Sequence, residues 1–206
     1  MLVIPLRGHQ YSLKPHFNYK MRGLVVELAD AMRFTNTTHK NAGDYLNSHD
    51  ICVLWGADAN DLDLSKLNFT HGDWTCYVQT TSMETWAKFK MDGLANNHML
   101  PATPEIQDLI RDVRIGDQIE FEGQLVDYNI DGGPFRTTST IRSDTGNGAC
   151  EIVYVTSFKF LKRHHASFYA LARLFEYLTV LSLIILGAAL FIAPYARKLF
   201  ADGRLR

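Results

Sequence analysis

Residues 174–193 of the chain read LFEYLTVLSLIILGAALFIA and carry one charged side chain, that of Glu176. A helix of this length spans about 30 Å at roughly 1.5 Å per residue, which matches the hydrocarbon core of a bilayer. The stretch is apolar on every side of such a helix, whereas a helix on a soluble domain has a single apolar stripe. We therefore predict one transmembrane helix within residues 167–200, ended by Pro194.

The predicted membrane helix has few polar features. Glu176 follows Arg173 at helical spacing, which favours an ion pair near the edge of the bilayer. Residues 187–189 are small and allow a second helix to pack closely. The residues expected in the membrane include Leu174, Glu176, Leu183, Ile184, Gly187 and Pro194. The lipid bilayer is thus the first expected partner.

The chain before this helix is long enough for one ordinary domain. The net charge is -1, with no long run of either sign, so a nucleic-acid partner is not expected. The expected divisions are an N-terminal arm (1–18), a soluble β-rich domain (19–158), a basic juxtamembrane segment (159–166), the transmembrane helix (167–200) and a tail (201–206).

Apolar patterning in the domain predicts an α+β fold that is rich in strands. Gly123 interrupts the phase of a long strand, as at a bend in a barrel. Short strands with hairpin returns suggest a small, partly closed barrel of the OB-like kind. The expected strands are 19–31, 51–55, 74–80, 118–128, 135–142 and 149–155, and the expected helices are 82–91 and 103–113. Asn96, Asn97 and His98 are expected in a loop.

The three cysteines are Cys52, Cys76 and Cys150. An odd number does not suit a disulfide framework. In an oxidising compartment we expect a Cys76–Cys150 bridge, and in the cytosol we expect three buried thiols. No CxxC or CxxCH motif is present, so dithiol redox chemistry and haem attachment have no local support, and no cofactor is predicted.

Cys150 and His98 are the first catalytic candidates. A thiol nucleophile needs a base within hydrogen-bond reach and a group that orients the base. Asp144 or Glu151 is the candidate for the orienting group. The alternative is that Cys150 is a core residue of a strand, because nothing local places His98 beside it.

Three further patterns are weaker. The pairs His49–Asp50 and His71–Asp73 offer zinc-ligand types, but their spacing matches no zinc pattern and no metal site is predicted. The loop SDTGNG at 143–148 lacks the spacing of a phosphate-binding loop and leads into a strand, so we interpret it as a turn. Arg136 and Arg142 are expected on one strand face, where they are candidates for binding an anion or a partner.

Six segments taken in order resemble an uncharacterised family of bacterial membrane proteins: YSLKPHFNYKMRGLVVELAD, DICVLWG, DWTCYVQT, NNHMLPA, RIGDQIEFEGQLVDY and TTSTIRSDTGNGACEIVYV. The resemblance implies a bacterial inner-membrane protein. It also implies a periplasmic domain, because similar proteins carry a hydrophobic N-terminal segment. Here the only early apolar run is 2–6, too short for an export signal, which predicts a cytoplasmic domain if Met1 is the true start. The resemblance brings no catalytic residues.

Three functions are compatible with these observations. The first hypothesis is a protein-binding or accessory module of a membrane assembly, with other membrane-protein subunits as partners. The second is a thiol-dependent hydrolase or transferase that uses Cys150 and His98. The third is an OB-like binder of a small ligand or oligosaccharide, which predicts an open aromatic groove near Trp55, Trp74 and Trp86.

Overall fold

The computed structural model describes residues 1–33, 37–72, 74–141, 143–144 and 149–201. The chain divides between His164 and His165 into two units, a β-rich domain and a helix. The strands of the domain are β1 (Leu2–Leu6), β2 (His9–Asp30), β3 (His49–Leu54), β4 (Asn68–His71), β5 (Cys76–Gln79), β6 (Leu94–Pro101), β7 (Gln118–Ile130) and β8 (Glu151–Lys162). Its helices are α1 (Thr37–Asn41), α2 (Ala57–Asp61), α3 (Met83–Lys88) and α4 (Pro104–Arg111), with short turns η1 (Leu64–Lys66) and η2 (Met91–Gly93).

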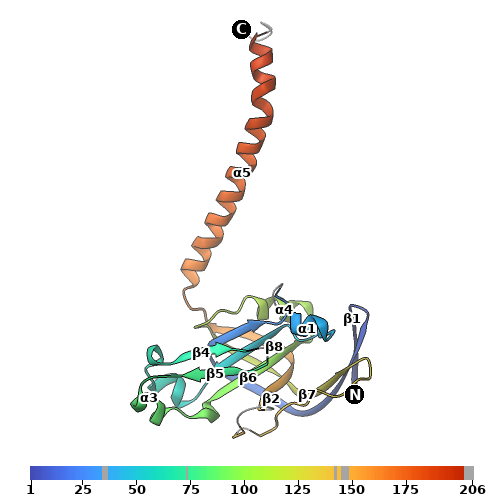
Figure 1. Cartoon of the computed structure of the whole chain (residues 1–206), viewed down its shortest axis with the longest axis vertical. Coiled ribbons are helices and arrows are strands. Elements are labelled where there is room, and N and C mark those ends of the chain that lie inside the picture. The colour runs from blue at the N-terminus through green and yellow to red at the C-terminus, as the bar shows by residue number, and fades with distance from the viewer. Residues whose placement is uncertain (34–36, 73, 142, 145–148, 202–206) are drawn as a thin grey trace. The chain divides into compact units, whose positions relative to one another are not determined.

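Five of these strands close into a ring. The order β2–β3–β6–β8–β7 returns to β2 through a long β2–β7 pairing. Neighbours are antiparallel except β6 and β8, which are parallel. Figure 1 shows these strands curving around a common interior, and β1 extends β2 at one edge. The predicted α+β fold with a small, partly closed, OB-like barrel is therefore confirmed.

The main core lies inside the ring. Buried side chains from β3, β6, β7 and β8 meet there, among them Ile51, Met99, Phe121 and Val153. Helix α4 adds Ile106 and Ile110 to the same cluster, and the Thr103 side chain accepts a hydrogen bond from the backbone N–H of Ile106. The predicted capped helix with one buried stripe is thus present.

Three local predictions are wrong. Asn96, Asn97 and His98 belong to β6 and not to a loop, because neighbouring strands bury and pair their polar groups. Residues 135–141 do not form a returning strand, and their one bridge joins Arg136 to Tyr128. The first long strand begins at His9, within the segment expected as an N-terminal arm.

Gly123 of β7 lies where the ring bends against β8. A Cβ atom added there would lie 2.1 Å from the backbone oxygen of Tyr154. We expect Gly123→Ala to lower the free energy of unfolding by about 2 kcal/mol, since the backbones of β7 and β8 must move apart. Urea denaturation of the variant measures this loss. Gly132→Ala is a control for a general effect of losing a glycine, because a Cβ there meets no atom within 4 Å, although its φ of +74° adds a strain of its own. Equal stability of wild type and Gly123→Ala would contradict the close approach.

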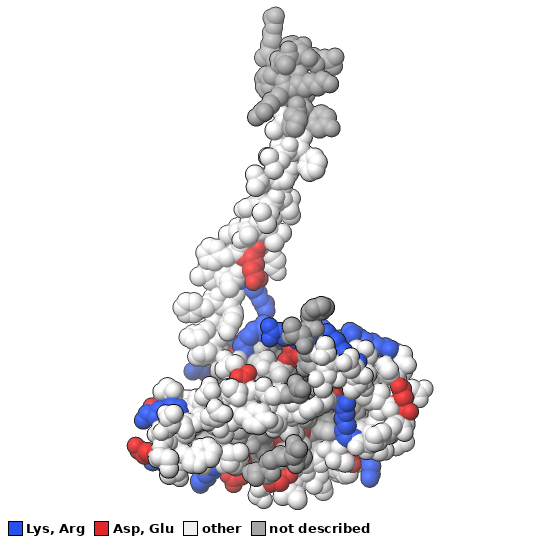
Figure 2. Space-filling model, in the orientation of Figure 1, with Lys and Arg blue, Asp and Glu red and all other residues white. Residues whose placement is uncertain are grey.

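The second unit contains helix α5 (Ala166–Ala201). Its segment Ser167–Ala193 has a mean hydropathy of 2.2 and buries none of its most apolar window, so it is long and apolar enough to cross a membrane. Figure 2 shows the described part of this helix almost free of charged side chains. Pro194 does not end the helix, which continues to Ala201. A proline removes one hydrogen bond, and apolar helices tolerate that loss.

Candidate functional site

Polar side chains form a row across the neighbouring strands β3, β6 and β8. Asp50 of β3 is directly opposite His98 of β6, and Cys150 immediately precedes Glu151, which is opposite Asn97. Because side chains alternate between the two faces of a strand, Asn96 and His98 share one face of β6. This face is opposite to the one that contributes Met99 to the main core. The sheet pairing thus brings residues distant in sequence into one row.

His98 and Asp50 form a buried pair. Nδ1 of His98 lies 2.6 Å from Oδ1 of Asp50, which also accepts a hydrogen bond from Nδ2 of Asn47 at 2.7 Å. The exposed fractions of His98 and Asp50 are 8% and 1%. The geometry fixes the imidazole ring with Nδ1 toward the carboxylate and leaves Nε2 for another partner.

The pair determines the charge of both groups. Burial lowers the pKa of His98, but the charge and hydrogen bond of Asp50, with a smaller contribution from Cys150, raise the pKa to about 10. Burial raises the pKa of Asp50, but the charge and hydrogen bond of His98, followed by the Asn47 hydrogen bond, lower it below its ordinary value. At neutral pH the row therefore contains an imidazolium and a carboxylate.

The thiol of Cys150 lies at the end of the pair. Its side chain is close enough to His98 to contribute to the raised pKa of that ring. Its Sγ lies 3.4 Å from Nδ2 of Asn96 and 3.4 Å from the backbone oxygen of Trp74. Cys150 is half-buried and forms no disulfide. A thiol beside an imidazolium that a carboxylate orients is the arrangement that nucleophilic catalysis by cysteine requires.

The segment between β4 and β5 is held next to this row by a disulfide. Cys76 of β5 is bonded to Cys52 of β3, with the two Cα atoms 6.2 Å apart. Trp74 belongs to the segment between β4 and β5. Its indole ring packs on His39 and His98, with ring centroids 4.2 and 6.3 Å away. Trp74 is 38% exposed. It therefore separates part of the row from solvent while Cys150 stays accessible.

Reduction of the Cys52–Cys76 disulfide should destabilise the domain by about 3 kcal/mol, because the bond closes a loop between residues 24 apart in sequence. Urea denaturation with and without reductant measures the effect in a Cys150→Ala background, which removes the third thiol. In a variant that also lacks Cys52 and Cys76, the reductant should have no effect. A transition that is insensitive to reductant in the first protein would contradict the bond.

A second buried carboxylate, that of Asp44, contacts two side chains that pack on Trp74, those of His39 and Arg136. Oδ2 of Asp44 accepts hydrogen bonds from Nδ1 of His39 at 2.9 Å, from the hydroxyl of Tyr128 at 2.8 Å and from the guanidinium of Arg136. The Arg136 guanidinium carbon lies 4.8 Å from the centroid of the Trp74 ring. Arg136, a candidate for partner binding, thus holds Asp44 and Trp74 in place. Its binding of a partner stays a prediction.

Two contacts expected from the sequence, a disulfide and an orienting carboxylate, differ in the structure. The predicted Cys76–Cys150 bridge is wrong, because Cys76 is bonded to Cys52. The carboxylate that contacts His98 is that of Asp50, whereas Asp144 accepts a hydrogen bond from the Ser139 hydroxyl at 2.5 Å. Cys150 and His98 lie near each other in the fold, and their catalytic role stays a prediction.

The other candidate sites are not assembled by the fold. His49 and Asp50 are successive residues of β3 and point to opposite faces, so they do not share a ligand. Nε2 of His71 contacts Oδ1 of Asn96 at 3.2 Å, and Asp73 lies outside the described residues. Among the residues that the structure describes, no cluster of three or more metal-ligating side chains is found. Arg142 and residues 145–148 of the SDTGNG loop also lie outside them.

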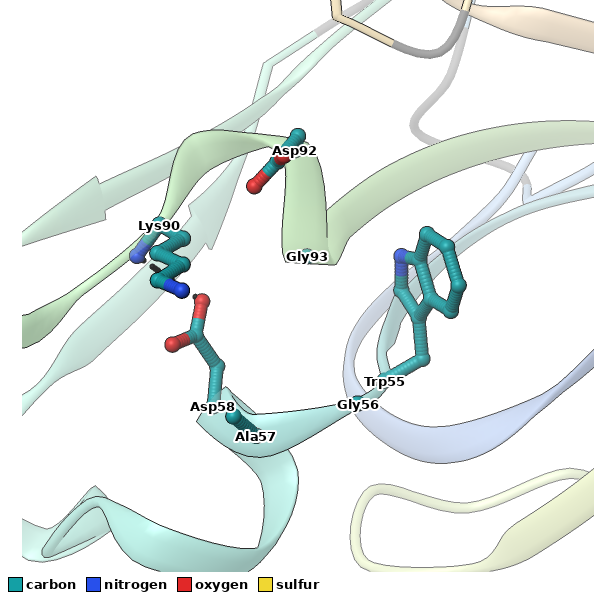
Figure 3. Close-up of a pocket in the computed structure, with 7 residues that line it drawn as sticks. All are labelled: Trp55, Gly56, Ala57, Asp58, Lys90, Asp92 and Gly93. Atoms are coloured by element: carbon teal, nitrogen blue, oxygen red, sulfur yellow. Dashed lines mark hydrogen bonds between the residues drawn. The ribbon is translucent and has the colours of Figure 1, made fainter.

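The three tryptophans have different surroundings. Trp55 lines a cavity of about 160 Å³, shown in Figure 3, whose other walls include Asp58 and Lys90. There the backbone N–H of Lys90 donates to Oδ2 of Asp58 at 2.9 Å. Trp86 is 45% exposed and stacks on Phe89, with the ring centroids 5.9 Å apart. The ring contacts of Trp74 and Trp86 involve different residues, and Trp55 lines a separate cavity, which gives no support to one shared aromatic groove.

The fold and the row of side chains define a class of protein: an OB-like barrel, followed by an apolar helix, with a thiol beside a buried histidine–aspartate pair. Comparison of the chain with protein-family models, curated proteins and solved structures found no match. The family resemblance described above therefore stays an expectation, and the argument for function depends on the site itself.

Proposed function

We propose that the chain is a membrane-anchored, thiol-dependent hydrolase or transferase. Cys150 is the nucleophile, His98 is the acid and base, and Asp50 orients His98. The observation that carries this proposal is the buried pair of Asp50 and His98, 2.6 Å apart on β3 and β6, with the side chain of Cys150 near enough to His98 to affect its pKa. Support also comes from the fold, because the second and third strands of an OB barrel form its ligand-binding face, and β3 and β6 occupy those positions here.

The geometry assigns a role to each group. Cys150 attacks an electrophilic substrate through its sulfur, beside the imidazolium of His98, and becomes covalently attached to it. His98 then gives its proton to the leaving group, and the neutral ring accepts a proton from water or from an acceptor molecule in the second half of the reaction. Asp50 keeps Nδ1 protonated, so that Nε2 exchanges the proton.

Alkylation by iodoacetamide tests the nucleophile. In the full chain in detergent, Cys150 should react about tenfold or more faster at pH 7 than the same thiol in urea-unfolded protein, because only the folded state places it beside His98. Mass spectrometry of the peptide that contains Cys150 locates the label, and Cys150→Ala provides the blank. A native thiol that reacts more slowly than the unfolded one would end this proposal.

The membrane helix and the disulfide support a location. The apolar segment Ser167–Ala193 is the proposed anchor, and the family resemblance favours a bacterial inner membrane. Disulfides persist in oxidising compartments, so Cys52–Cys76 favours the periplasmic side for the barrel. A reporter fused to the C-terminus should then be active in the cytoplasm. A cytoplasmic barrel would instead place that reporter in the periplasm.

A second candidate is the accessory module in a membrane assembly. Strand β1 favours it, because β1 pairs with β2 on one side only and exposes the apolar side chains of Leu2 and Val3. Such an edge can accept a strand from a partner subunit. Affinity purification in mild detergent, with Val3→Lys as the matched variant, tests this role. Loss of one defined membrane subunit with Val3→Lys would support it, and purification of the wild type alone would oppose it.

A further inference from the structure

The side chain of Asn96 lies between the two sulfur centres of the site. On β6, Asn96 is directly opposite Cys52 of β3, and on the other side its neighbour is Cys150 at the start of β8. Its exposed fraction is 6%. Two strand spacings separate Cys52 from Cys150, about 10 Å. This exceeds the roughly 7 Å within which two cysteines can be bridged, so Cys150 is not placed to exchange with Cys52.

Hydrogen bonds fix the direction of the Asn96 amide. Nδ2 lies 3.0 Å from the backbone oxygen of Trp74, and a carbonyl oxygen can only accept, so the amide nitrogen is on this side. The same nitrogen lies 3.4 Å from Sγ of Cys150. Oδ1 points the other way and lies 3.2 Å from Nε2 of His71. One N–H of Asn96 is therefore held against the reacting sulfur.

We propose that the Cys150 site acts on acyl compounds such as esters, thioesters or amides, and that Nδ2 of Asn96 stabilises the oxyanion of the tetrahedral intermediate. This inference rests on the proposed role of Cys150 as nucleophile and names the substrate class of the same site. An N–H group next to the attacking sulfur is close to the place where the carbonyl oxygen gains charge, since that oxygen is bonded to the carbon that Sγ attacks.

The proposed reaction has two stages, the formation of a thioester on Cys150 and its breakdown. The Cys150 thiolate forms a bond to the carbonyl carbon, and the electron pair of the C=O double bond moves to oxygen, where Asn96 donates a hydrogen bond. The C=O bond re-forms as the leaving group departs with the proton of His98, and a thioester remains on Cys150. Water or an acceptor then attacks the thioester, its proton passes to His98, and the thiolate is released.

We prefer acyl substrates because of the effect that a hydrogen bond from Asn96 has on the nucleophilicity of the sulfur. In alkyl transfer or thiol–disulfide exchange no oxyanion develops, and a hydrogen bond to the thiolate only lowers its nucleophilicity. In acyl transfer the same donor follows the charge from sulfur to oxygen. The preorganised amide, held by Trp74 and His71, therefore supplies an interaction that is strongest in the transition state.

Two reactions of the full chain in detergent separate the possibilities. p-Nitrophenyl acetate measures acylation of Cys150, and iodoacetamide measures its alkylation, which has no oxyanion. In Asn96→Leu and Asn96→Ala we expect acylation to fall about 10²- to 10³-fold while alkylation changes by less than about threefold. Asn97→Ala is the matched control, because Asn97 is on the same strand but donates to the backbone oxygens of Ile51 and Ala95 on the opposite face.

The outcomes are distinct. If wild-type Cys150 is alkylated rapidly but not acylated, the acyl inference is overturned while the thiol proposal stands. If both rates fall equally in the Asn96 variants, Asn96 is only structural and its role as oxyanion donor is overturned. If Cys150 reacts with neither reagent, the proposed function itself fails. Thermal unfolding of Asn96→Leu beside Asn97→Ala shows whether a loss of acylation merely follows a loss of stability.

Discussion

Replacing His98 with alanine should lower the alkylation rate of Cys150 roughly 10- to 100-fold at pH 7. The imidazolium is the cation that the structure places beside the half-buried thiol, and without it the negative charge of an attacking sulfur loses its nearest positive partner. Stopped-flow alkylation with the full chain in detergent measures the rate. His9→Ala is a matched control, since His9 pairs with Asp131 and lies outside the row.

The pH profile of the same reaction gives a second readout. Because the pKa of His98 is raised to about 10, the ring stays protonated from about pH 6 to 8, and its advantage over His98→Ala should persist across this interval, below the pH of about 8.5 at which ordinary thiols ionise. Above about pH 10 His98 loses its proton, and the two rates should converge. Convergence already near pH 6.5, the ordinary value for histidine, would show that Asp50 does not hold the charge of His98.

The sequence predicted best what depends on one segment alone. The apolar helix is recognisable because each residue of 174–193 contributes to the same property, whatever the rest of the chain does. Helix α4 was equally accessible, since the Thr103 cap, Pro104 and the stripe of Ile106 and Ile110 are local signals. The glycine-bent strands indicated a barrel, although their partners could not be derived.

The candidate site was only half predictable, because its polar strand resembles a loop. Asn96, Asn97 and His98 are short polar residues of the kind that ends a strand pattern, yet all three are buried in β6. Asp50 pairs with His98 and also accepts from Asn47, while Tyr19 and backbone oxygens satisfy Asn97. These partners come from other parts of the chain, so no local pattern reveals them. A buried polar strand conflicts with local rules, and such conflicts are expected at functional sites.

Non-local pairing also decided the cysteines and the orienting carboxylate. Cys52 and Asp50 are two residues apart on β3 and therefore share a face. Cys52 is bonded to Cys76 of β5, and Asp50 is opposite His98. The sequence linked Asp50 to His49, its neighbour in the chain, which points the other way. A useful signal was available in hindsight: Asp50 and Cys52 alternate as a strand face requires, and both are residue types that need a partner when buried.

Substituting Asp50 should cause the largest loss of stability of any single change in the row. Asp50→Ala leaves His98 buried beside a void, and breaking a buried ion pair in this way costs about 3–5 kcal/mol. Asp50→Asn keeps the side-chain volume and an oxygen that can accept a hydrogen bond from Nδ1 of His98. Its smaller loss of stability therefore measures the contribution of the carboxylate charge alone. Asp108→Asn changes the net charge equally at an exposed position of α4 and should be nearly neutral.

The pH dependence gives this prediction its sign. The pKa of His98 is about 10 in the folded protein and 6.5 as an ordinary value. The folded state therefore binds this proton more tightly, and the stabilisation is complete below about pH 6.5 and is lost as the pH rises toward about 10. The pKa of Asp50 is lowered from 3.8, so its contribution is present above about pH 4 and is lost as the pH falls through the folded value. Urea denaturation of the wild type between about pH 2 and 10 should show both losses, and Asp50→Asn should show neither. Parallel curves for the two proteins from pH 6.5 to 10 would mean that His98 is neutral in the folded protein, and then Cys150 would have no cation beside it.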